Sequence, residues 1–104
     1  MAVAGERRTG MRERFNTPVI YQIDHQTFLQ DAYDLSPNGI GVLCPIEPHI
    51  GAKTKVHFVH PREQTDVFAQ GEVVHVQSST TFAGFFRVGL RFYSVNSSKR
   101  LPEA

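Results

Sequence analysis

The sequence predicts an all-β fold, most simply a small six-stranded antiparallel barrel in a single domain. From residue 17 onward, short stretches rich in Val, Ile, Phe, Tyr and Thr are separated by segments rich in Pro, Gly, Asn and Asp. No segment keeps the i, i+3, i+4, i+7 apolar pattern of an amphipathic helix over ten residues. Six strand-like stretches within about 75 residues favour a closed sheet, because closure removes exposed strand edges.

The elements follow in order from the breaks between them. Turn-forming residues cluster near 24–25, 36–38, 45–51, 61–65 and 78–81. The predicted strands therefore cover residues 19–23, 27–35, 39–44, 53–59, 68–77 and 85–92. The last strand is the clearest, because Phe86, Val88, Leu90 and Phe92 alternate with Phe85, Arg87, Gly89 and Arg91. We place the barrel at residues 15–93 and expect the polar residues 94–104 to form a frayed C-terminal tail.

Residues 1–14 differ in charge from the rest of the chain and are predicted to form a flexible N-terminal arm. The arm contains four arginines and two glutamates, a net charge of +2, whereas the remaining residues carry seven basic and eight acidic groups, a net charge of −1. All four cations of the arm are arginines. The planar guanidinium group suits phosphate and the edge of guanine, so anion-binding chemistry is expected in the arm.

The composition argues against several classes of protein. No apolar run approaches the roughly 20 residues that span a bilayer, and no secretory signal precedes the arm, so the sequence predicts a cytoplasmic protein without membrane insertion. The single cysteine, Cys44, is expected to be a small buried residue. His57 and His60 are spaced to point to opposite faces of a strand, and Ser36 has no local base. Neither a metal site nor a nucleophilic triad is therefore predicted.

Two short motifs carry the candidate ligand-binding residues. Arg8 and Arg12 form an RxxxR pattern in the arm, and residues 34–39 read Asp-Leu-Ser-Pro-Asn-Gly, a DxSxxG pattern. Each motif alone has a simple explanation. A terminal arginine cluster is usually solvated or a nonspecific phosphate patch. The DxSxxG segment is typical of a tight hairpin, with Pro37 at the first turn position and positive φ accepted by the Asn-Gly pair that follows.

In combination, the two motifs resemble the PilZ domain family. Stretches at 51–58, 69–74 and 84–92 are similar to later strands of that family and occur in the same order, so the resemblance spans about residues 6–93. It implies a PilZ-type barrel that binds the bacterial second messenger cyclic di-GMP. It further implies that the chain is not an enzyme and needs no cofactor besides this ligand.

The resemblance also implies roles for particular residues. The six residues concerned are Arg7, Arg8, Arg12, Asp34, Ser36 and Gly39. Arg8 and Arg12 would grip guanine and phosphate groups, and Arg7 would assist them. The carboxylate of Asp34 suits the N1 and N2 donors of guanine, and the hydroxyl of Ser36 can donate to a phosphodiester oxygen. The final glycine would let the backbone pass close to the ligand.

Alternatives from other functional classes remain open. A nucleotide-independent PilZ adaptor in a protein–protein complex would share the fold. A small-barrel nucleic-acid binder would interleave aromatics with cations, and Phe85, Arg87 and Arg91 share one face of the last strand, but the acidic body argues against nucleic acid. As a single-domain receptor, a monomer or weak homodimer, the chain would relay its signal to an unidentified downstream protein. The resemblance implies motility, adhesion or exopolysaccharide production as the process controlled.

Overall fold

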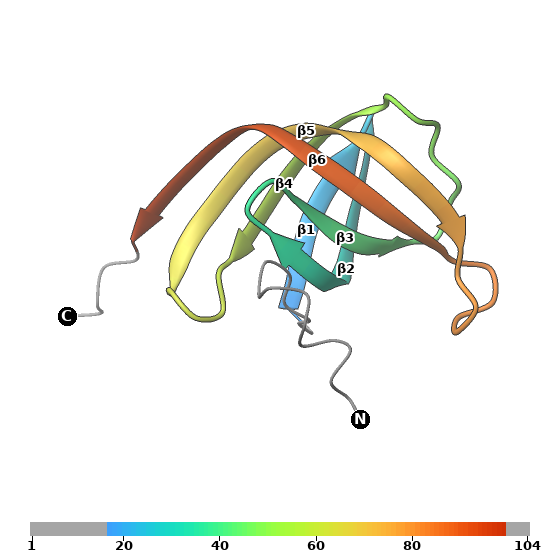
Figure 1. Ribbon diagram of the computed structural model, residues 1–104, viewed down its shortest axis with the longest axis horizontal. Helices are drawn as coiled ribbons and strands as arrows, with labels where there is room; N and C mark the ends of the chain where they lie inside the picture. The colour runs from blue at the N-terminus through green and yellow to red at the C-terminus, as the bar shows by residue number, and fades with distance from the viewer. Residues whose placement is uncertain (1–16, 100–104) are drawn as a thin grey trace.

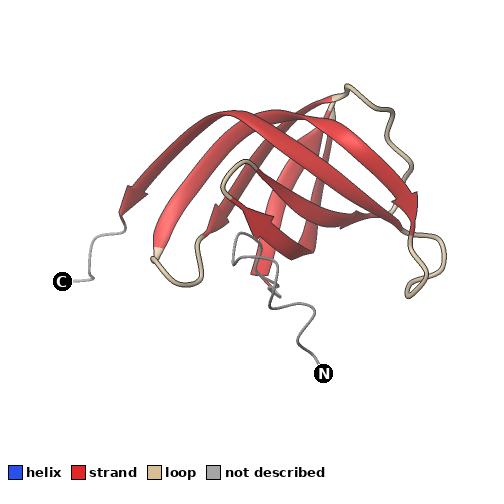
Figure 2. Cartoon of the chain, in the orientation of Figure 1, coloured by secondary structure: helices blue, strands red, loops and turns tan. Residues whose placement is uncertain are grey.

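The computed structural model describes residues 17–99, and β-strands make up all of the regular structure in this range (Figures 1 and 2). The strands are β1 (Thr17–Ile23), β2 (Gln26–Ser36), β3 (Gly39–Cys44), β4 (Lys53–Val59), β5 (Thr65–Ser78) and β6 (Phe86–Lys99). They close into an antiparallel barrel with the neighbour order β1-β2-β3-β6-β5-β4, which confirms the predicted fold class. Within these residues no helix has the length and apolar character to cross a membrane. The predicted arm at residues 1–14 lies outside the described residues.

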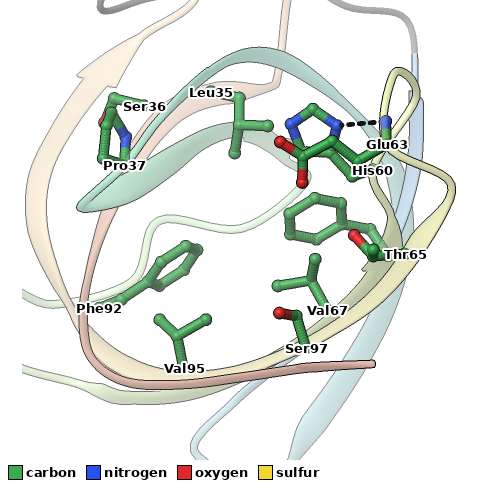
Figure 3. Close-up of a pocket in the computed structure, with 11 residues that line it drawn as sticks. Leu35, Ser36, Pro37, His60, Glu63, Thr65, Val67, Phe92, Val95 and Ser97 are labelled. Carbon is green, nitrogen blue, oxygen red and sulfur yellow. Dashed lines mark hydrogen bonds between the residues drawn. The ribbon is translucent and has the colours of Figure 1, made fainter. Parts of the chain in front are cut away.

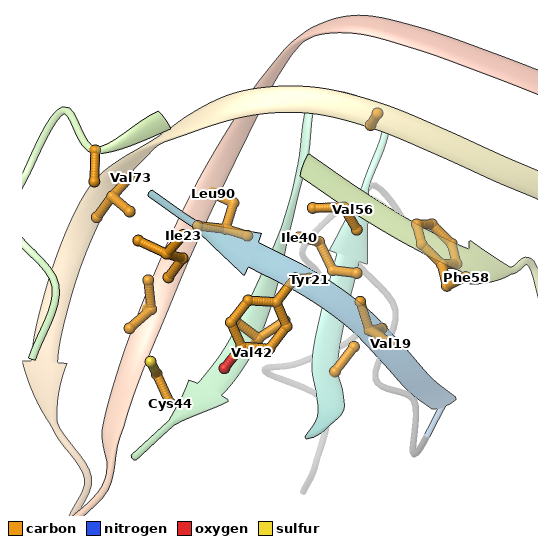
Figure 4. Packing of buried hydrophobic residues seen from close by; sticks show 14 of the residues in the cluster. Val19, Tyr21, Ile23, Ile40, Val42, Cys44, Val56, Phe58, Val73 and Leu90 are labelled. Atoms are coloured by element: carbon orange, nitrogen blue, oxygen red, sulfur yellow. The ribbon is translucent and has the colours of Figure 1, made fainter. Parts of the chain in front are cut away.

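The core fills the barrel with the inward-facing side chains of all six strands (Figure 4). Its fully buried members include Val19, Val42 and Val73, from three different strands. In β6 the predicted alternation is confirmed, because Val88 and Leu90 are buried. Such interdigitated apolar side chains supply most of the driving force for folding a domain of this size.

One polar group is built into this core. The hydroxyl of Tyr21 donates a hydrogen bond of 2.6 Å to the carbonyl oxygen of Leu43, and its ring stacks on Phe28. Burial raises the pKa of the Tyr21 phenol far above its ordinary value, and the neighbouring Cys44 acts in the same direction. Cys44 is itself fully buried, as predicted. The phenol is therefore a structural donor that ties β1 to β3.

The last two strands are longer than the sequence pattern predicts. β5 begins at Thr65 rather than at residue 68, and β6 continues to Lys99 rather than ending at residue 92. Residues 94–99 pair with residues 65–70 of β5, so the predicted barrel boundary at residue 93 and the frayed tail are wrong as far as Lys99. Backbone hydrogen bonds to β5 hold this polar stretch in a strand, although it lacks the apolar alternation that reveals a buried strand.

The turn between β2 and β3 is a tight hairpin, as predicted, with Pro37 and Asn38 between the strands. Its backbone differs from the prediction in one respect. Neither Asn38 nor Gly39 has a positive φ angle; among the described residues such angles occur at Asp24, Gln64, Gly51 and Gly84. The glycine of the DxSxxG motif must therefore have a reason other than a left-handed backbone conformation.

Candidate functional site

The predicted barrel residues Asp34 and Ser36 lie at the end of β2 and face outward. The residue between them, Leu35, packs against the core, and neighbouring residues of a strand point to opposite faces. Both side chains are half-buried rather than fully exposed. The predicted arginines Arg7, Arg8 and Arg12 lie outside the described residues, so the structure brings together only the barrel half of the predicted site.

A β-bulge in β2 precedes these residues. Ala32 pairs with Val42 and Asp34 pairs with Gly41, which leaves Tyr33 as the extra residue. Because a bulge shifts the alternation by one residue, Tyr33 and Asp34 both lie on the outer face. The bulge thus re-aims the end of β2 and adds an aromatic ring beside the candidate carboxylate. The sequence analysis missed Tyr33, since nothing in the local pattern marks the bulge.

Gly39 owes its small size to the close approach of β3 and β6. A Cβ atom at this position would collide with the backbone carbonyl oxygen of Leu90. The approach is fixed by a 2.7 Å hydrogen bond from the amide of Phe92 to the carbonyl oxygen of Asn38. The hydroxyl of Ser36 also donates a long bond of 3.4 Å to the carbonyl of Gly39, inside the turn. The DxSxxG turn is therefore held against β6.

Glycines form the floor of the outer face beside Asp34 and Ser36. Asp34 pairs with Gly41, which pairs with Gly89 of β6, which in turn pairs with His75 of β5. Three strand spacings therefore separate Asp34 from His75, about 14 Å, with no side chain on the two positions between them. In the next row, Ser36 is separated from Arg91 by Gly39 alone. We call this surface the glycine floor.

An aromatic ring and a guanidinium border the glycine floor. The ring of Tyr33 lies against Gly41, where a Cβ atom would come within 2.6 Å of it. The guanidinium carbon of Arg87 lies 4.3 Å from the centre of the same ring. Arg87 and Arg91 alternate with buried residues of β6 and both point outward. The repeated glycines of β3, at positions 39 and 41, were the one sequence signal that could have revealed this floor.

A cavity of about 360 Å³ lies at one end of the barrel, behind the DxSxxG turn (Figure 3). We call this opening the barrel mouth. It is lined by Leu35, Ser36, Pro37, Phe58, His60, Glu63, Thr65, Val67, Phe92, Val95 and Ser97. Its walls are thus largely apolar, and polar groups come from the loop between β4 and β5 and from the strand residues Ser36, Thr65 and Ser97.

The two histidines considered in the sequence analysis serve different surfaces. His57 lies on the outside, where its ring stacks on Phe68 with centres 4.2 Å apart and its Nε2 is 3.2 Å from a carboxylate oxygen of Asp66. His60 lines the barrel mouth and accepts hydrogen bonds from the amides of two loop residues. In residues 17–99 no cluster of three or more His, Cys, Asp or Glu side chains is placed to hold a metal ion.

Comparison with known proteins identifies the family. The model of the PilZ domain matches residues 6–101, and the chain therefore belongs to the PilZ domain family, whose members are receptor and adaptor domains rather than enzymes. Among solved structures, the chain is similar to the Bacillus subtilis inhibitor of motility MotI/DgrA, with a TM-score of 0.72 and 16% identity. That match covers 86% of this chain but only 44% of the other, so this chain spans less than half of that protein. No curated protein matches the sequence.

Proposed function

We propose that this protein is a cytoplasmic receptor for cyclic di-GMP that holds the ligand on the glycine floor and relays the signal to a separate protein. One observation carries the proposal: Asp34 and Ser36 both face outward at the end of β2, and each pairs with a glycine of β3. The ring of Tyr33 lies over Gly41 on this floor, and a purine ring can stack on such an aromatic surface. A carboxylate and a hydroxyl at its border supply directional hydrogen bonds.

The chemistry of the border suits a guanine nucleotide. The carboxylate of Asp34 accepts from the N1 and N2 groups of guanine, and the hydroxyl of Ser36 donates to a phosphodiester oxygen. The ring of Tyr33, with Arg87 beside it, offers a stacking partner for a base. Arg91 adds a positive charge opposite Ser36. These groups recognise base and phosphate from one side only.

The arm is attached where it can close the other side. Thr17 pairs with Ala32, two residues before Asp34 in β2. Arg12 precedes Thr17 by five residues and Arg8 by nine, so an extended chain lets them reach about 17 Å and 30 Å from this point. Both distances suffice to cross the glycine floor. In this proposal Arg8 and Arg12 grip guanine and phosphate, and Arg7 assists.

Both halves of the site are needed on energetic grounds. Two bidentate arginine contacts contribute roughly 2 to 6 kcal/mol. Ordering the backbone of five arm residues costs on the order of 5 to 10 kcal/mol. The arm alone therefore does not bind, whereas arm and floor together allow micromolar affinity, near −8 kcal/mol. The arm then orders on the barrel when the ligand binds.

A nucleotide-independent adaptor is the second candidate function, and one observation favours it. Two residues of the DxSxxG motif already have structural roles, because Ser36 closes its own turn and Gly39 allows the approach of β6. A motif maintained for the turn alone would keep these residues without any ligand.

Isothermal titration of cyclic di-GMP into the whole chain tests the proposal. The variants are Arg8→Ala/Arg12→Ala and Asp34→Asn/Ser36→Ala, and Arg62→Ala, an exposed arginine of the β4–β5 loop, is the matched control. We expect micromolar binding that each double variant weakens at least tenfold while the control stays within twofold. Circular dichroism verifies that every variant is folded. Absence of heat with the wild-type protein would favour the adaptor, and binding that survives both double variants would move the ligand elsewhere.

A further inference from the structure

Among residues 17–99, the second half of β6 is paired along one edge only. β3 pairs with β6 only from Phe86 to Arg91, whereas residues 94–99 pair with β5 alone. Of the strands in the described range, none lies against the other edge of residues 93–99. Figure 1 shows this part of β6 arching away from β3 toward the end of the described chain. Within the described range, its backbone N–H and C=O groups on that edge pair with no other strand and could accept a further one.

This edge lacks most of the features that prevent strand addition. Residues 93–98 read Tyr-Ser-Val-Asn-Ser-Ser, without a charged residue or a proline, and all six are exposed. Natural edge strands are commonly protected by lysine, proline or inward-pointing charges. The edge begins at a bulge and ends at Lys99, which leaves about six uncharged residues between them. That length matches an ordinary strand.

The unpaired edge borders the barrel mouth. Val95 and Ser97 point into the cavity from β6, opposite Leu35 at the end of β2 (Figure 3). A strand added to this edge would lie across the mouth. Every second side chain of that strand would then point into the cavity of about 360 Å³. Strand addition draws affinity from the backbone and specificity from such side-chain pockets.

The charge of the barrel mouth restricts what the added strand carries. Among residues 17–99, Glu63 supplies the one carboxylate that lines the cavity, and no lysine or arginine of this range lines it. The apolar part of the lining consists of Leu35, Pro37, Phe58, Val67, Phe92 and Val95. The complementary segment has a large apolar side chain for the cavity and a basic side chain near Glu63.

We propose that the edge at residues 93–99, with the barrel mouth, is an acceptor for an extended segment of a partner protein that is apolar at alternate positions and carries a basic residue. A second copy of this chain fits less well. Its own edge would present Val95 and Ser97 to the mouth, and these side chains are too short to fill a cavity of about 360 Å³. The proposal stands on the edge and the cavity, so it goes beyond the proposed receptor function and holds with or without cyclic di-GMP.

Selection from a displayed library of random dodecapeptides tests the acceptor edge on the purified whole chain. The blocking variant is Val95→Lys, which places a charge in the mouth. The control is Val74→Lys, because Val74 is a similarly exposed valine, 43% against 49%, that does not line the cavity. We expect enriched peptides with alternating apolar residues and a basic residue. Val95→Lys should weaken them at least tenfold and Val74→Lys less than twofold, and Glu63→Gln should weaken them several-fold.

A second measurement keeps the test independent of the variants. With isotope-labelled wild-type protein, an enriched peptide should shift the amide signals of residues 93–99 and the methyl signals of Leu35 and Val67. Failure to enrich any peptide, or enrichment of peptides that shift other surfaces, would overturn the proposal. So would a wild-type dimer in analytical ultracentrifugation that Val95→Lys dissolves, because the occupant would then be a second copy. Titration of cyclic di-GMP is a separate experiment, so its failure leaves these outcomes readable.

Discussion

The two halves of β6 show how one strand serves two purposes. From Phe86 to Arg91 the strand is paired on both edges, and its backbone lies so close to β3 that Gly39 has no room for a side chain. From residue 94 to Lys99 its described pairing is with β5 alone, and the side chains of residues 93–98 are exposed. The closed half therefore holds the barrel and the glycine floor together, while the open half offers backbone groups to a partner. Stability and interaction are divided along the same strand.

The largest effect is expected from filling the close approach in the closed half. Gly39→Ala would place a methyl group against the carbonyl oxygen of Leu90. Because backbone atoms must move, we expect a loss of about 3 kcal/mol in the free energy of unfolding, measured by urea denaturation. Gly89→Ala is the matched control, since its methyl group would meet only the side chain of His75, at 3.2 Å. An equal loss in both variants would contradict the account of Gly39.

A pair of valines compares the two halves directly. Val88 is fully buried in the closed half, whereas Val95 is 49% exposed in the open half. Val88→Ala should cost about 2 to 3 kcal/mol of unfolding free energy, because it removes buried methyl groups and leaves a cavity. Val95→Ala should cost no more than about 0.5 kcal/mol. Both variants are measured by thermal and urea unfolding. If Val95→Ala lost as much unfolding free energy as Val88→Ala, the open half would belong to the cooperative core.

The buried Tyr21 makes the free energy of unfolding depend on pH in the alkaline range. The raised pKa of Tyr21 means that its neutral form is favoured in the folded state. Its contribution is complete below about pH 10, the pKa in the unfolded chain, and is lost as the pH rises above it. Tyr21→Phe should cost about 1 kcal/mol at neutral pH, because the carbonyl of Leu43 loses its donor, and should flatten the alkaline decline.

Tyr93→Phe is the control for that experiment, since Tyr93 is 58% exposed in the open half. It should leave the free energy of unfolding at pH 7, measured with urea, within about 0.5 kcal/mol of the wild-type value. A loss at pH 7 as large in Tyr93→Phe as in Tyr21→Phe, or an alkaline decline that persists unchanged in Tyr21→Phe, would contradict the role given to the buried phenol.

The smallest expected difference concerns two cation–π pairs. The guanidinium of Arg87 lies 4.3 Å from the ring centre of Tyr33 beside the closed half, and the ammonium of Lys53 lies 5.5 Å from the ring centre of Tyr93 at the start of the open half. Arg87→Gln should cost about 0.5 to 1 kcal/mol of unfolding free energy, and Lys53→Gln less than about 0.5 kcal/mol. Double-mutant cycles with Tyr33→Leu and Tyr93→Leu measure the two couplings. A stronger coupling for Lys53 would show that distance to the ring does not set the order.

The sequence predicted the positions of all six strands along the chain, because runs of strand-forming residues end at clear breaks and some strands alternate between faces, as Val88 and Leu90 show in β6. It missed the open half of β6 because residues 94–99 are polar on both faces, and only their pairing with β5 makes them a strand. It placed the hairpin turn at Pro37 and Asn38 correctly, and Asp34 and Ser36 lie just before this turn, in β2. The bulge at Tyr33 and the meeting of Gly41 with Gly89 depend on register, which a single sequence does not encode locally.

Only part of the candidate site could be predicted from the sequence, for a similar reason. Motif residues can be recognised from their spacing, but their surroundings come from strands distant in the sequence. Gly39 shows the difference most clearly. The sequence analysis predicted that it lets the backbone pass close to a ligand. In the structure its close neighbour is the carbonyl oxygen of Leu90. The roles of Arg7, Arg8 and Arg12 stay predictions, since these residues lie outside the described range.

A titration of isotope-labelled protein with cyclic di-GMP, followed through its amide signals, tests the central claim most directly. The account predicts that the signals of Tyr33, Asp34, Ser36, Gly41 and Gly89 shift together and saturate at micromolar ligand, while those of residues 53–59 on the far side of the barrel stay in place. Shifts confined to other surfaces, or none at millimolar ligand, would contradict the proposal that the glycine floor binds the messenger.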